Sequence, residues 1–154
     1  MNITDLVSKD RITLGVDCAS KKKALEYVSE VLSQDRQDVS SGEVFDCLIG
    51  RERLGSTGMG KGIAIPHCRL KGNNQTFAAL IRLKDGIDYD SVDGEPVDLI
   101  LAMVVPEDAT EEHLQTLAQL AKMFSDASLV DRLHKATDSQ SVYDILESGV
   151  AASQ

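Results

Sequence analysis

The residues best suited to chemistry lie in one segment that ends at a histidine. Four of the eight residues from 55 to 62 are glycine, and the apolar run 63–65, Pro66 and His67 follow directly. Glycine lets a backbone approach a neighbouring group or an anion closely and adopt positive φ. The run 63–65 is long enough for one buried strand, and Pro66 lacks the N–H that would continue its hydrogen-bond ladder. We therefore predict that His67 lies at a strand end on a stiffened backbone, where a reactive side chain can be held.

The chemistry that fits this segment is the transfer of a phosphoryl group to His67. A neutral imidazole is a nucleophile, and a pKa near ~6.5 makes that form abundant at neutral pH. The phosphoryl oxygens then need hydrogen-bond donors around them. The guanidinium of Arg51, in the last turn of a predicted helix, is one candidate, although the helix dipole alone would favour a basic residue there. The other predicted supports belong to the glycine-rich turn and are Ser56, Thr57, Gly60 and Gly62.

Two further histidines differ in how well they are placed. His113 follows a helix-capping sequence at 108–111, so it should lie at a helix N-terminus, where a side chain can be both held and exposed. His134 follows Leu133 in a short predicted helix, beside Lys135, and we expect it to be a surface residue. His113 is therefore a candidate site residue and His134 is not.

Other chemistries fit the sequence less well. A metal site needs about three or four converging ligands, but His67 and Cys68 are adjacent and would point to opposite faces of a strand. No Cys-x-x-Cys or His-x-x-x-His occurs, so we predict no metal and no cofactor. Cys68 has no assignable partner to orient a base for nucleophilic catalysis. The glycines at 58, 60 and 62 precede a strand, whereas those of a nucleotide-binding loop follow a strand and open a helix.

Composition indicates an acidic globular protein with reduced thiols. The 154 residues carry a formal net charge of −9, which repels a phosphate backbone, so nucleic-acid binding is not expected. This acidity either suits a partner with a basic face or only aids solubility. No apolar run is long enough to span a membrane and no secretory signal is visible, so we expect no membrane association and a cytoplasmic location. The three widely spaced cysteines fit free thiols better than disulfides.

Capping signals and apolar spacing predict the helices that must position these residues. Ser20 precedes a helix over 21–32, whose first three lysines form a solvated run or, alternatively, bind an anion or a partner. Ser40 and Glu43 form a capping box for a second helix, which should end near Leu54 with Gly55 at its C′ position. Later helices are predicted to begin near residue 111, at 126 or 128, and at 138 or 139, the last stopped by Gly149.

Strands alternate with these helices. The run 97–105 is the strongest apolar run in the chain and suggests a central strand covered on both faces. Turn signals at 85–86 and 93–94 indicate a hairpin-like excursion before it. Other apolar runs are a strand or docking segment at 11–16, the strand at 63–65 and a mostly buried strand at 77–83.

This alternation predicts the fold class. We expect an α/β protein with a single-domain mixed β-sheet sandwiched by helices on both faces. The domain should span residues 1–150, and residues 151–154 should form a loose tail with nothing to pack against.

The segment 51–67, Arg-Glu-Arg-Leu-Gly-Ser-Thr-Gly-Met-Gly-Lys-Gly-Ile-Ala-Ile-Pro-His, strongly resembles the enzyme IIA domains of the bacterial phosphoenolpyruvate-dependent phosphotransferase system. Its Gly-Ile-Ala-Ile-Pro-His part is highly specific. The similarity covers nearly the whole chain, including residues 20–26 and the Pro-Val-Asp-Leu run from Pro96. The most similar type is the nitrogen-regulatory one, in the group that also holds the fructose and mannitol domains. The resemblance implies the same mixed sheet between helices.

The resemblance also implies roles for the candidate residues. His67 would accept a phosphoryl group from a histidine phosphocarrier protein of the nitrogen type, and Arg51 and His113 match the two accessory site positions. At a helix N-terminus the pKa of His113 should be lowered, which leaves a neutral ring able to donate one hydrogen bond to a phosphoryl oxygen.

Two positions depart from the family pattern. Cys68 stands where glycine usually follows the active histidine, which implies a change in the redox sensitivity or the backbone freedom of the site. Lys61 stands where mannitol-type domains tend to carry glutamate, which argues against a mannitol role.

Two functions are compatible with this resemblance. The protein would relay a phosphoryl group through His67, and its phosphorylation state would regulate target proteins. The alternative is a fructose-type sugar-transport enzyme IIA that passes the phosphoryl group to a separate IIB domain. A structural protein that only looks like the family is the remaining alternative.

Overall fold

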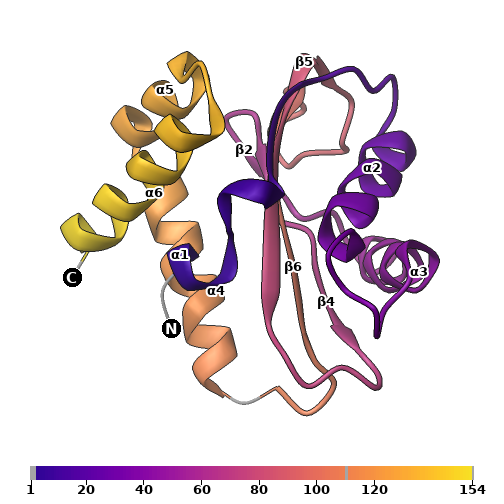
Figure 1. Cartoon of the computed structure of the whole chain (residues 1–154). Helices are drawn as coiled ribbons and strands as arrows, with labels where there is room; N and C mark the ends of the chain where they lie inside the picture. The colour runs from indigo at the N-terminus through magenta and orange to yellow at the C-terminus, as the bar shows by residue number, and fades with distance from the viewer. Residues whose placement is uncertain (1–2, 110, 154) are drawn as a thin grey trace.

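A mixed six-stranded β-sheet forms the middle layer of the protein (Figure 1). The computed structural model describes residues 3–109 and 111–153, except for the side chains of residues 111–114 and 150–153. The strands are β1 (Ile12–Val16), β2 (Gly58–Gly60), β3 (Ile63–Ala64), β4 (His67–Leu70), β5 (Phe77–Ile87) and β6 (Val97–Pro106). Their order is β1-β5-β6-β3-β2, and β4 pairs with β6 beyond the end of β3. The β5–β6 and β2–β3 pairs are antiparallel and the other pairs are parallel.

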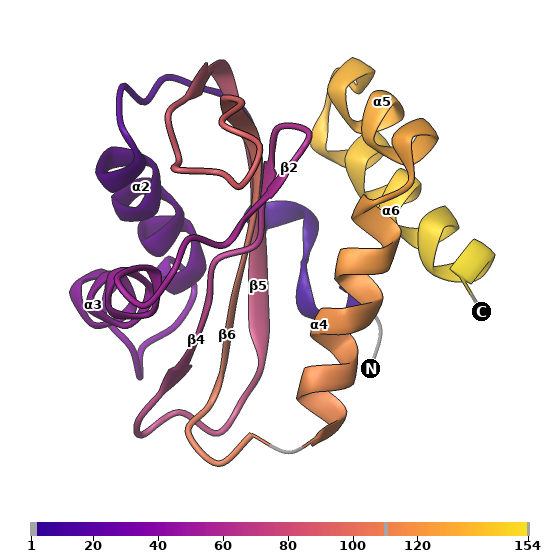
Figure 2. The ribbon, with the colours of Figure 1, turned by 180° about the vertical axis from the view of Figure 1, so that it is seen from behind.

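Helices cover both faces of this sheet, as predicted. Figures 1 and 2 show α2 (Lys21–Ser33) and α3 (Ser41–Glu52) on one face. The other face carries α1 (Ile3–Leu6), α4 (Glu111–Phe124), α5 (Ala127–Lys135) and α6 (Ser139–Ser153). Consecutive strand residues point to opposite faces, so β6 supplies both cores: Leu101 packs with the α4–α6 layer and Ile100 with α2 and α3. The predicted central strand and fold class are therefore confirmed.

The predicted helix starts are confirmed by their caps. The Ser20 hydroxyl accepts the N–H of Lys23 at 3.2 Å. Ser40 and Glu43 form the predicted capping box, in which each side chain accepts the other's backbone N–H. Asp126 caps α5 by accepting the N–H groups of residues 128 and 129.

The second helix ends close to the predicted position, but the predicted C′ glycine is wrong. α3 ends at Glu52, and Arg53 is its C-cap. Gly55 has φ of 159°, so it does not adopt the left-handed conformation that a C′ glycine supplies. After the helix the chain is held by the Glu52 side chain, which turns inward and accepts the N–H of Thr57.

Pro66 separates two short strands that lie end to end along β6. Ile63 of β3 pairs in parallel with Leu99, and His67 of β4 pairs in parallel with Met103. The Pro66 carbonyl accepts the N–H of Met103 at 2.9 Å, so the chain stays attached to β6 between the two strands. Pro66 therefore ends the first strand, as predicted, and His67 lies at the N-terminal end of a second strand, β4, which the sequence did not predict.

Of the two turns predicted around the excursion before β6, one is present and one is not. Residues 85–86 lie inside β5, at an irregularity in its register with β6, so the predicted turn there is wrong. A Cβ at Gly86 would lie 2.8 Å from the Pro96 Cβ, so this glycine permits a close approach of the chain. The turn at 93–94 is confirmed, since Gly94 has φ of 71° and donates to the Ser91 carbonyl at 3.0 Å.

Gly149 lies inside α6 and does not stop it. The helix continues to Ser153, so the predicted end is wrong. A Cβ at Gly149 would lie 2.5 Å from Leu129 Cδ1 and 2.9 Å from Met123 Sδ. This glycine therefore allows α6 to pack tightly against α5 and α4, which local sequence signals do not reveal.

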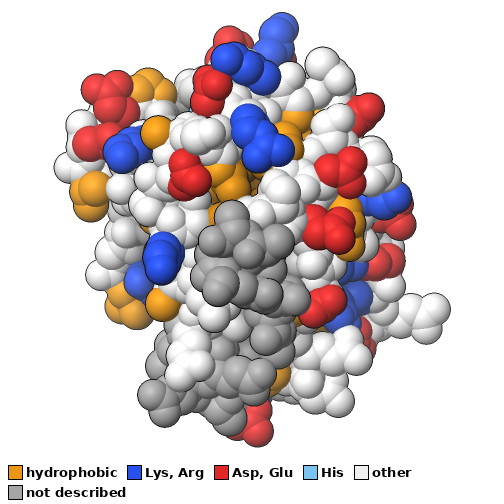
Figure 3. Space-filling model, turned by 90° about the vertical axis from the view of Figure 1, so that its left-hand side faces the viewer, with side chains coloured by type: hydrophobic (Ala, Val, Ile, Leu, Met, Phe, Trp, Pro, Cys, Tyr) orange, Lys and Arg blue, Asp and Glu red, His pale blue; other side chains and the backbone are white. Residues whose placement is uncertain are grey.

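The surface over α4–α6 carries mixed charge. Figure 3 shows acidic and basic side chains interspersed on this face, with small hydrophobic areas between them. The net charge of −9 is therefore not gathered into one acidic field on this side of the molecule. In the described part of the chain no helix has the length and apolar character needed to cross a membrane.

Candidate functional site

The backbone just before His67 holds its imidazole in one tautomer. His67 Nδ1 lies 2.8 Å from the Ile65 carbonyl oxygen. A carbonyl oxygen only accepts hydrogen bonds, so Nδ1 carries the hydrogen, and the lone pair of the neutral ring is on Nε2. The ring is half-buried at the start of β4. Nε2 is therefore the nitrogen that can act as a nucleophile.

A cavity of about 820 Å³ brings His67 and Arg51 together, as predicted from the sequence. It lies along the edge strand β4, and its lining includes residues of α3 and Leu117 of α4. Arg51 Nη1 donates to the Gly55 carbonyl at 3.0 Å, which holds the guanidinium beside the end of α3. Leu54, also part of the lining, is 84% exposed and gives the cavity an apolar rim.

Cations gather around this cavity although the chain is acidic. Arg51, Arg69 and Lys71 line it, and the carboxylates of Glu43 and Asp46 lie on its α3 side. Guanidinium and ammonium groups close to a histidine favour a bound anion such as a phosphoryl group. The local charge therefore differs from the average of the chain.

Arg69 also lines the cavity, but the sequence analysis did not single it out. It stands two positions after His67 in β4, so both side chains lie on the same face of the strand. Its guanidinium donates to the carbonyls of Glu107 at 3.3 Å and Ala109 at 3.2 Å. Arg69 thus ties β4 to the connection that leads into α4. The spacing of two would have revealed it if β4 had been predicted.

The structure places the four predicted support residues outside the lining of this cavity. The Ser56 hydroxyl donates to the Tyr89 carbonyl at 3.0 Å and accepts the Gly58 N–H at 3.1 Å. The Thr57 side chain is buried against Glu52. Gly60 and Gly62 adopt φ of 93° and 83° in the turn between β2 and β3. Any support from Ser56, Thr57, Gly60 and Gly62 is therefore indirect in this conformation, and direct contact with a phosphoryl group stays a prediction.

A buried carboxylate, Glu52, organises this turn. Its side chain is only 1% exposed and accepts hydrogen bonds from the N–H and the hydroxyl of Thr57 and from the phenol of Tyr89. Lys21 Nζ lies 2.9 Å from Glu52 Oε2 and 4.5 Å from the centre of the Tyr89 ring. Burial, and then the charge of Glu52, raise the pKa of Tyr89 far above its ordinary value, so the phenol stays protonated and donates.

This cluster corrects one expectation about the lysines at 21–23. Lys21 is neither solvated nor free to bind an anion, because its side chain is 19% exposed and neutralises Glu52. An ion pair with a buried carboxylate needs additional hydrogen bonds to offset desolvation, and Thr57 and Tyr89 supply them. Local sequence did not indicate this pairing, because Lys21 and Glu52 belong to different helices.

The Glu52 cluster connects to His67 through the backbone. Glu52 holds Thr57, the Thr57 carbonyl accepts the N–H of Ile65 at 3.1 Å, and the Ile65 carbonyl accepts Nδ1–H of His67. Each member fixes the position of the next. The orientation of the imidazole thus depends on groups that do not touch it.

The other two histidines have different surroundings. His113 lies in the first turn of α4, as predicted, but its side chain is outside the described residues. His134 Nε2 lies 2.9 Å from Asp98 Oδ1, and the His134 side chain is 32% exposed. His134 is thus partly exposed, as expected of a surface residue, and the contact with Asp98 on β6 was not predicted.

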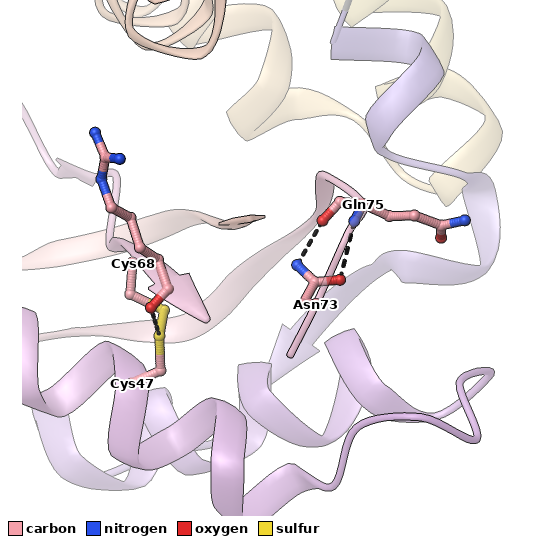
Figure 4. The surroundings of a disulfide bond; sticks show 5 residues. Cys47, Cys68, Asn73 and Gln75 are labelled. Atoms are coloured by element: carbon pink, nitrogen blue, oxygen red, sulfur yellow. Dashed lines mark hydrogen bonds between the residues drawn. A yellow bond between two sulfur atoms is a disulfide. The ribbon is translucent and has the colours of Figure 1, made fainter. Parts of the chain in front are cut away.

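The cysteines contradict the prediction of free thiols. Cys47 of α3 and Cys68 of β4 form a disulfide, with a Cα–Cα distance of 5.8 Å (Figure 4). Their separation of 21 residues gave no sign of this, and they meet because α3 packs on β4. Cys18 is free, as expected, and burial together with the charge of Asp17 raises the pKa of its thiol.

Comparison with known proteins agrees with this geometry. The family model described as "Phosphoenolpyruvate-dependent sugar phosphotransferase system, EIIA 2" matches residues 5–149. The chain belongs to this EIIA 2 family. A nitrogen regulatory protein of Pseudomonas aeruginosa is 39% identical over 146 residues, which cover 95% of each chain. The nitrogen regulatory protein of Escherichia coli K12 is 35% identical over 147 residues, or 95% of this chain and 90% of that one.

A solved relative confirms the fold of this EIIA 2 chain. The crystal structure of the nitrogen regulatory protein IIA-Ntr from Neisseria meningitidis superposes with a TM-score of 0.88 at 39% identity. The match covers 94% of this chain and 98% of that one. The chain is therefore a phosphotransferase-system component of the IIA type, similar to nitrogen regulatory proteins over almost its full length.

Lys61 of this EIIA 2 chain stabilises the turn between β2 and β3 through its backbone. It adopts φ of 59°, and its N–H donates to Asp93 Oδ2 at 2.9 Å. This hydrogen bond, followed by one from the Glu95 N–H, lowers the pKa of Asp93. The Lys61 side chain is exposed and outside the cavity lining.

The glycine-rich turn of this EIIA 2 chain also depends on close packing at Gly58, and we expect Gly58→Ala to destabilise it. A Cβ there would lie 2.8 Å from Ser91 Oγ and 2.9 Å from Ser91 Cα. Rotation of a side chain cannot relieve the second contact, so the free energy of unfolding should fall by ~1–3 kcal/mol. Urea unfolding measures it. The control is Gly50→Ala, inside α3, where the added Cβ would have no neighbouring atom within 4 Å outside the helix backbone. Its stability should rise by ~0.5–1 kcal/mol. Equal stabilities for the two variants would contradict this packing.

Proposed function

We propose that this protein is a phosphohistidine carrier and regulator of the nitrogen-related phosphotransferase system. It accepts a phosphoryl group on Nε2 of His67 from a histidine phosphocarrier protein, and its phosphorylation state regulates target proteins. The observation that carries this proposal is the hydrogen bond from His67 Nδ1–H to the Ile65 carbonyl, which leaves Nε2 unprotonated beside a cavity lined by Arg51. Similarity to nitrogen regulatory proteins supports the regulatory part.

The bonds broken and formed in the transfer step belong to the donor protein and to this protein alone. The N–P bond of the donor's phosphohistidine breaks as the bond from phosphorus to His67 Nε2 forms, and the released donor imidazole keeps its electron pair. His67 Nδ1–H stays bonded to Ile65 throughout, so the ring needs no change of tautomer. Arg51, which donates through Nη1 to the Gly55 carbonyl, then directs its remaining N–H groups to a phosphoryl oxygen. His113, at the start of α4, is the proposed second donor to the phosphoryl group.

The rim of the cavity suits protein partners. Leu54 offers an exposed apolar contact beside His67, and the mixed charges of Arg69, Lys71, Glu43 and Asp46 offer polar contacts around it. A phosphoryl group adds about −1.5 to −2 charges at this point, which changes the electrostatic complementarity with a target. The donor and the targets belong to the cytoplasm in this proposal, and nucleic acid and membranes are not partners.

Phosphorylation in a reconstituted system tests the proposal. The protein is incubated with phosphoenolpyruvate, the first enzyme of the phosphotransferase system and a nitrogen-type phosphocarrier. The intact mass should increase by one phosphoryl group, and fragmentation should locate that group on His67. The modification should be acid-labile, as a phosphoramidate is. No gain in mass while the carrier itself is phosphorylated, or a gain on another residue, would contradict the proposal.

The fructose-type alternative is separated by a further arm of the same experiment. Purified phosphorylated protein is mixed with a fructose-type IIB domain, and loss of the phosphoryl group to that domain is followed over time. We expect a transfer much slower than the uptake from the phosphocarrier. Transfer at a comparable rate would support the sugar-transport role instead. Pull-downs with each phosphorylation state then identify the regulated targets.

A further inference from the structure

The Cys47–Cys68 disulfide joins the two elements that carry the phosphoryl site. Cys68 directly follows His67 in β4, and Cys47 precedes Arg51 by four residues in α3, a rise of about 6 Å on the same side of the helix. Figure 4 shows the bond bridging the helix and the strand. Both cysteines also line the cavity that contains His67 and Arg51. The crosslink is therefore part of the wall of the site.

The site accommodates the thiol form as well as the disulfide. Cys47 Sγ lies 3.3 Å from the Arg69 carbonyl oxygen. A disulfide sulfur has no hydrogen to donate, but the Cys47 thiol would find this acceptor already in place. Cys68 is 7% exposed in an apolar core, and a free cysteine is also commonly buried in such surroundings. Either redox state thus satisfies its surroundings without unfolding.

Contacts other than the crosslink also anchor α3. α3 is anchored independently by the fully buried Val44 and Leu48 and by its capping box. Cys47 is half-buried, and the cavity gives small molecules access to the sulfur atoms. In a reducing compartment, a disulfide with these properties is typically transient and redox-sensing.

We propose that Cys47 and Cys68 form a reversible oxidation site that slows phosphoryl acceptance by His67 when it is oxidised. This inference rests on the function proposed above. Cys47–SH and Cys68–SH react with a low-molecular-weight disulfide, R–S–S–R, and yield the protein disulfide and two R–SH molecules. The two protein thiols are oxidised, the small disulfide is reduced, and the two thiol protons pass to the two released thiols. A small dithiol reverses the step by the same exchange.

The coupling to His67 follows from the position of the crosslink. To contact a phosphoryl group, the Arg51 side chain, which donates through Nη1 to the Gly55 carbonyl, and the end of α3 must adjust to the docked carrier. The disulfide fixes α3 to β4 one turn before Arg51 and restricts this adjustment. Transfer rates depend steeply on alignment, and a misplacement of about 1 Å can cost ~100-fold. The dithiol form leaves α3 free to move and should be the faster acceptor.

Rates of phosphorylation in the two redox states test this proposal. The full chain is oxidised with glutathione disulfide or reduced with dithiothreitol, the reagent is removed, and maleimide labelling counts free thiols before the carrier is added. We expect the reduced form to accept the phosphoryl group ~10-fold faster than the oxidised form. Cys47→Ser and Cys47→Ala should each accept the phosphoryl group at a rate that glutathione disulfide does not change. Cys18→Ser, the matched control with a free cysteine elsewhere, should keep the difference.

The outcomes separate this proposal from the function on which it rests. Equal rates, or a faster oxidised form, would overturn the redox inference and leave the phosphocarrier function intact. A rate difference that persists in the Cys47 variants would also overturn it. Failure of both forms to be phosphorylated would instead remove the proposed function, and with it this inference. Labelling of all three cysteines after glutathione disulfide treatment would show that no disulfide forms and would overturn the inference directly.

Discussion

Replacing His67 with asparagine is expected to abolish phosphorylation completely. The asparagine amide can donate to the Ile65 carbonyl in place of Nδ1–H, so the local hydrogen bond is retained. It offers no nucleophilic nitrogen in place of Nε2, so no phosphoramidate can form. The intact mass of His67→Asn after incubation with the phosphorylated carrier should equal that of the untreated protein.

A matched control comes from the other described histidine. His134→Gln places an amide nitrogen near the position of His134 Nε2, where it can keep the hydrogen bond to Asp98. This variant should be phosphorylated at the rate of the unchanged protein, because His134 is not part of the cavity lining. Circular dichroism of both variants establishes that they are folded. Phosphorylation of His67→Asn, or its loss in His134→Gln alone, would contradict the assignment of His67.

The parts of the site that sequence predicted are those with local signals. The helix starts at Ser20 and Ser40 depend on hydrogen bonds to residues three positions later, and such caps can be recognised in a sequence. His67 stood out because glycines and a proline immediately precede it. Arg51 stood out because the helix end and the glycine-rich turn are adjacent in the chain. The long apolar run of β6 similarly predicted a central strand covered on both faces.

The parts that sequence did not predict depend on contacts between distant segments. Whether residues 67–70 form a strand is decided by the length of β6, with which they pair. Gly149 resembles a helix stop until Leu129 and Met123 are known to pack against it. The Cys47–Cys68 bond exists because a helix face meets a strand, and no spacing rule encodes that meeting. Glu52 is one of several charged residues in its helix, and nothing near it in the sequence indicates its burial.

Replacing Glu52 with alanine should have the largest effect on stability. Removal of one partner of a buried ion pair leaves the other partner desolvated and costs ~3–5 kcal/mol. Here Lys21 would lose its counter-ion, and the Thr57 N–H and the Tyr89 phenol would lose their acceptor. Urea unfolding followed by circular dichroism should show a midpoint far below that of the unchanged protein. Asp46→Ala, an exposed acidic residue of the same helix, should change stability by no more than ~0.5 kcal/mol.

A second variant separates the charge of Glu52 from its shape. If the cost arises from the unpaired cation, Lys21→Met combined with Glu52→Leu should recover part of the stability lost in Glu52→Ala, because an apolar pair needs no counter-ion. The double variant still lacks the acceptor for Thr57, so the turn that reaches His67 through Ile65 should remain loosened. We therefore expect recovered stability together with slower phosphorylation. Full recovery of both would mean that Glu52 only neutralises Lys21 and that the backbone connection from Thr57 to His67 does not depend on it.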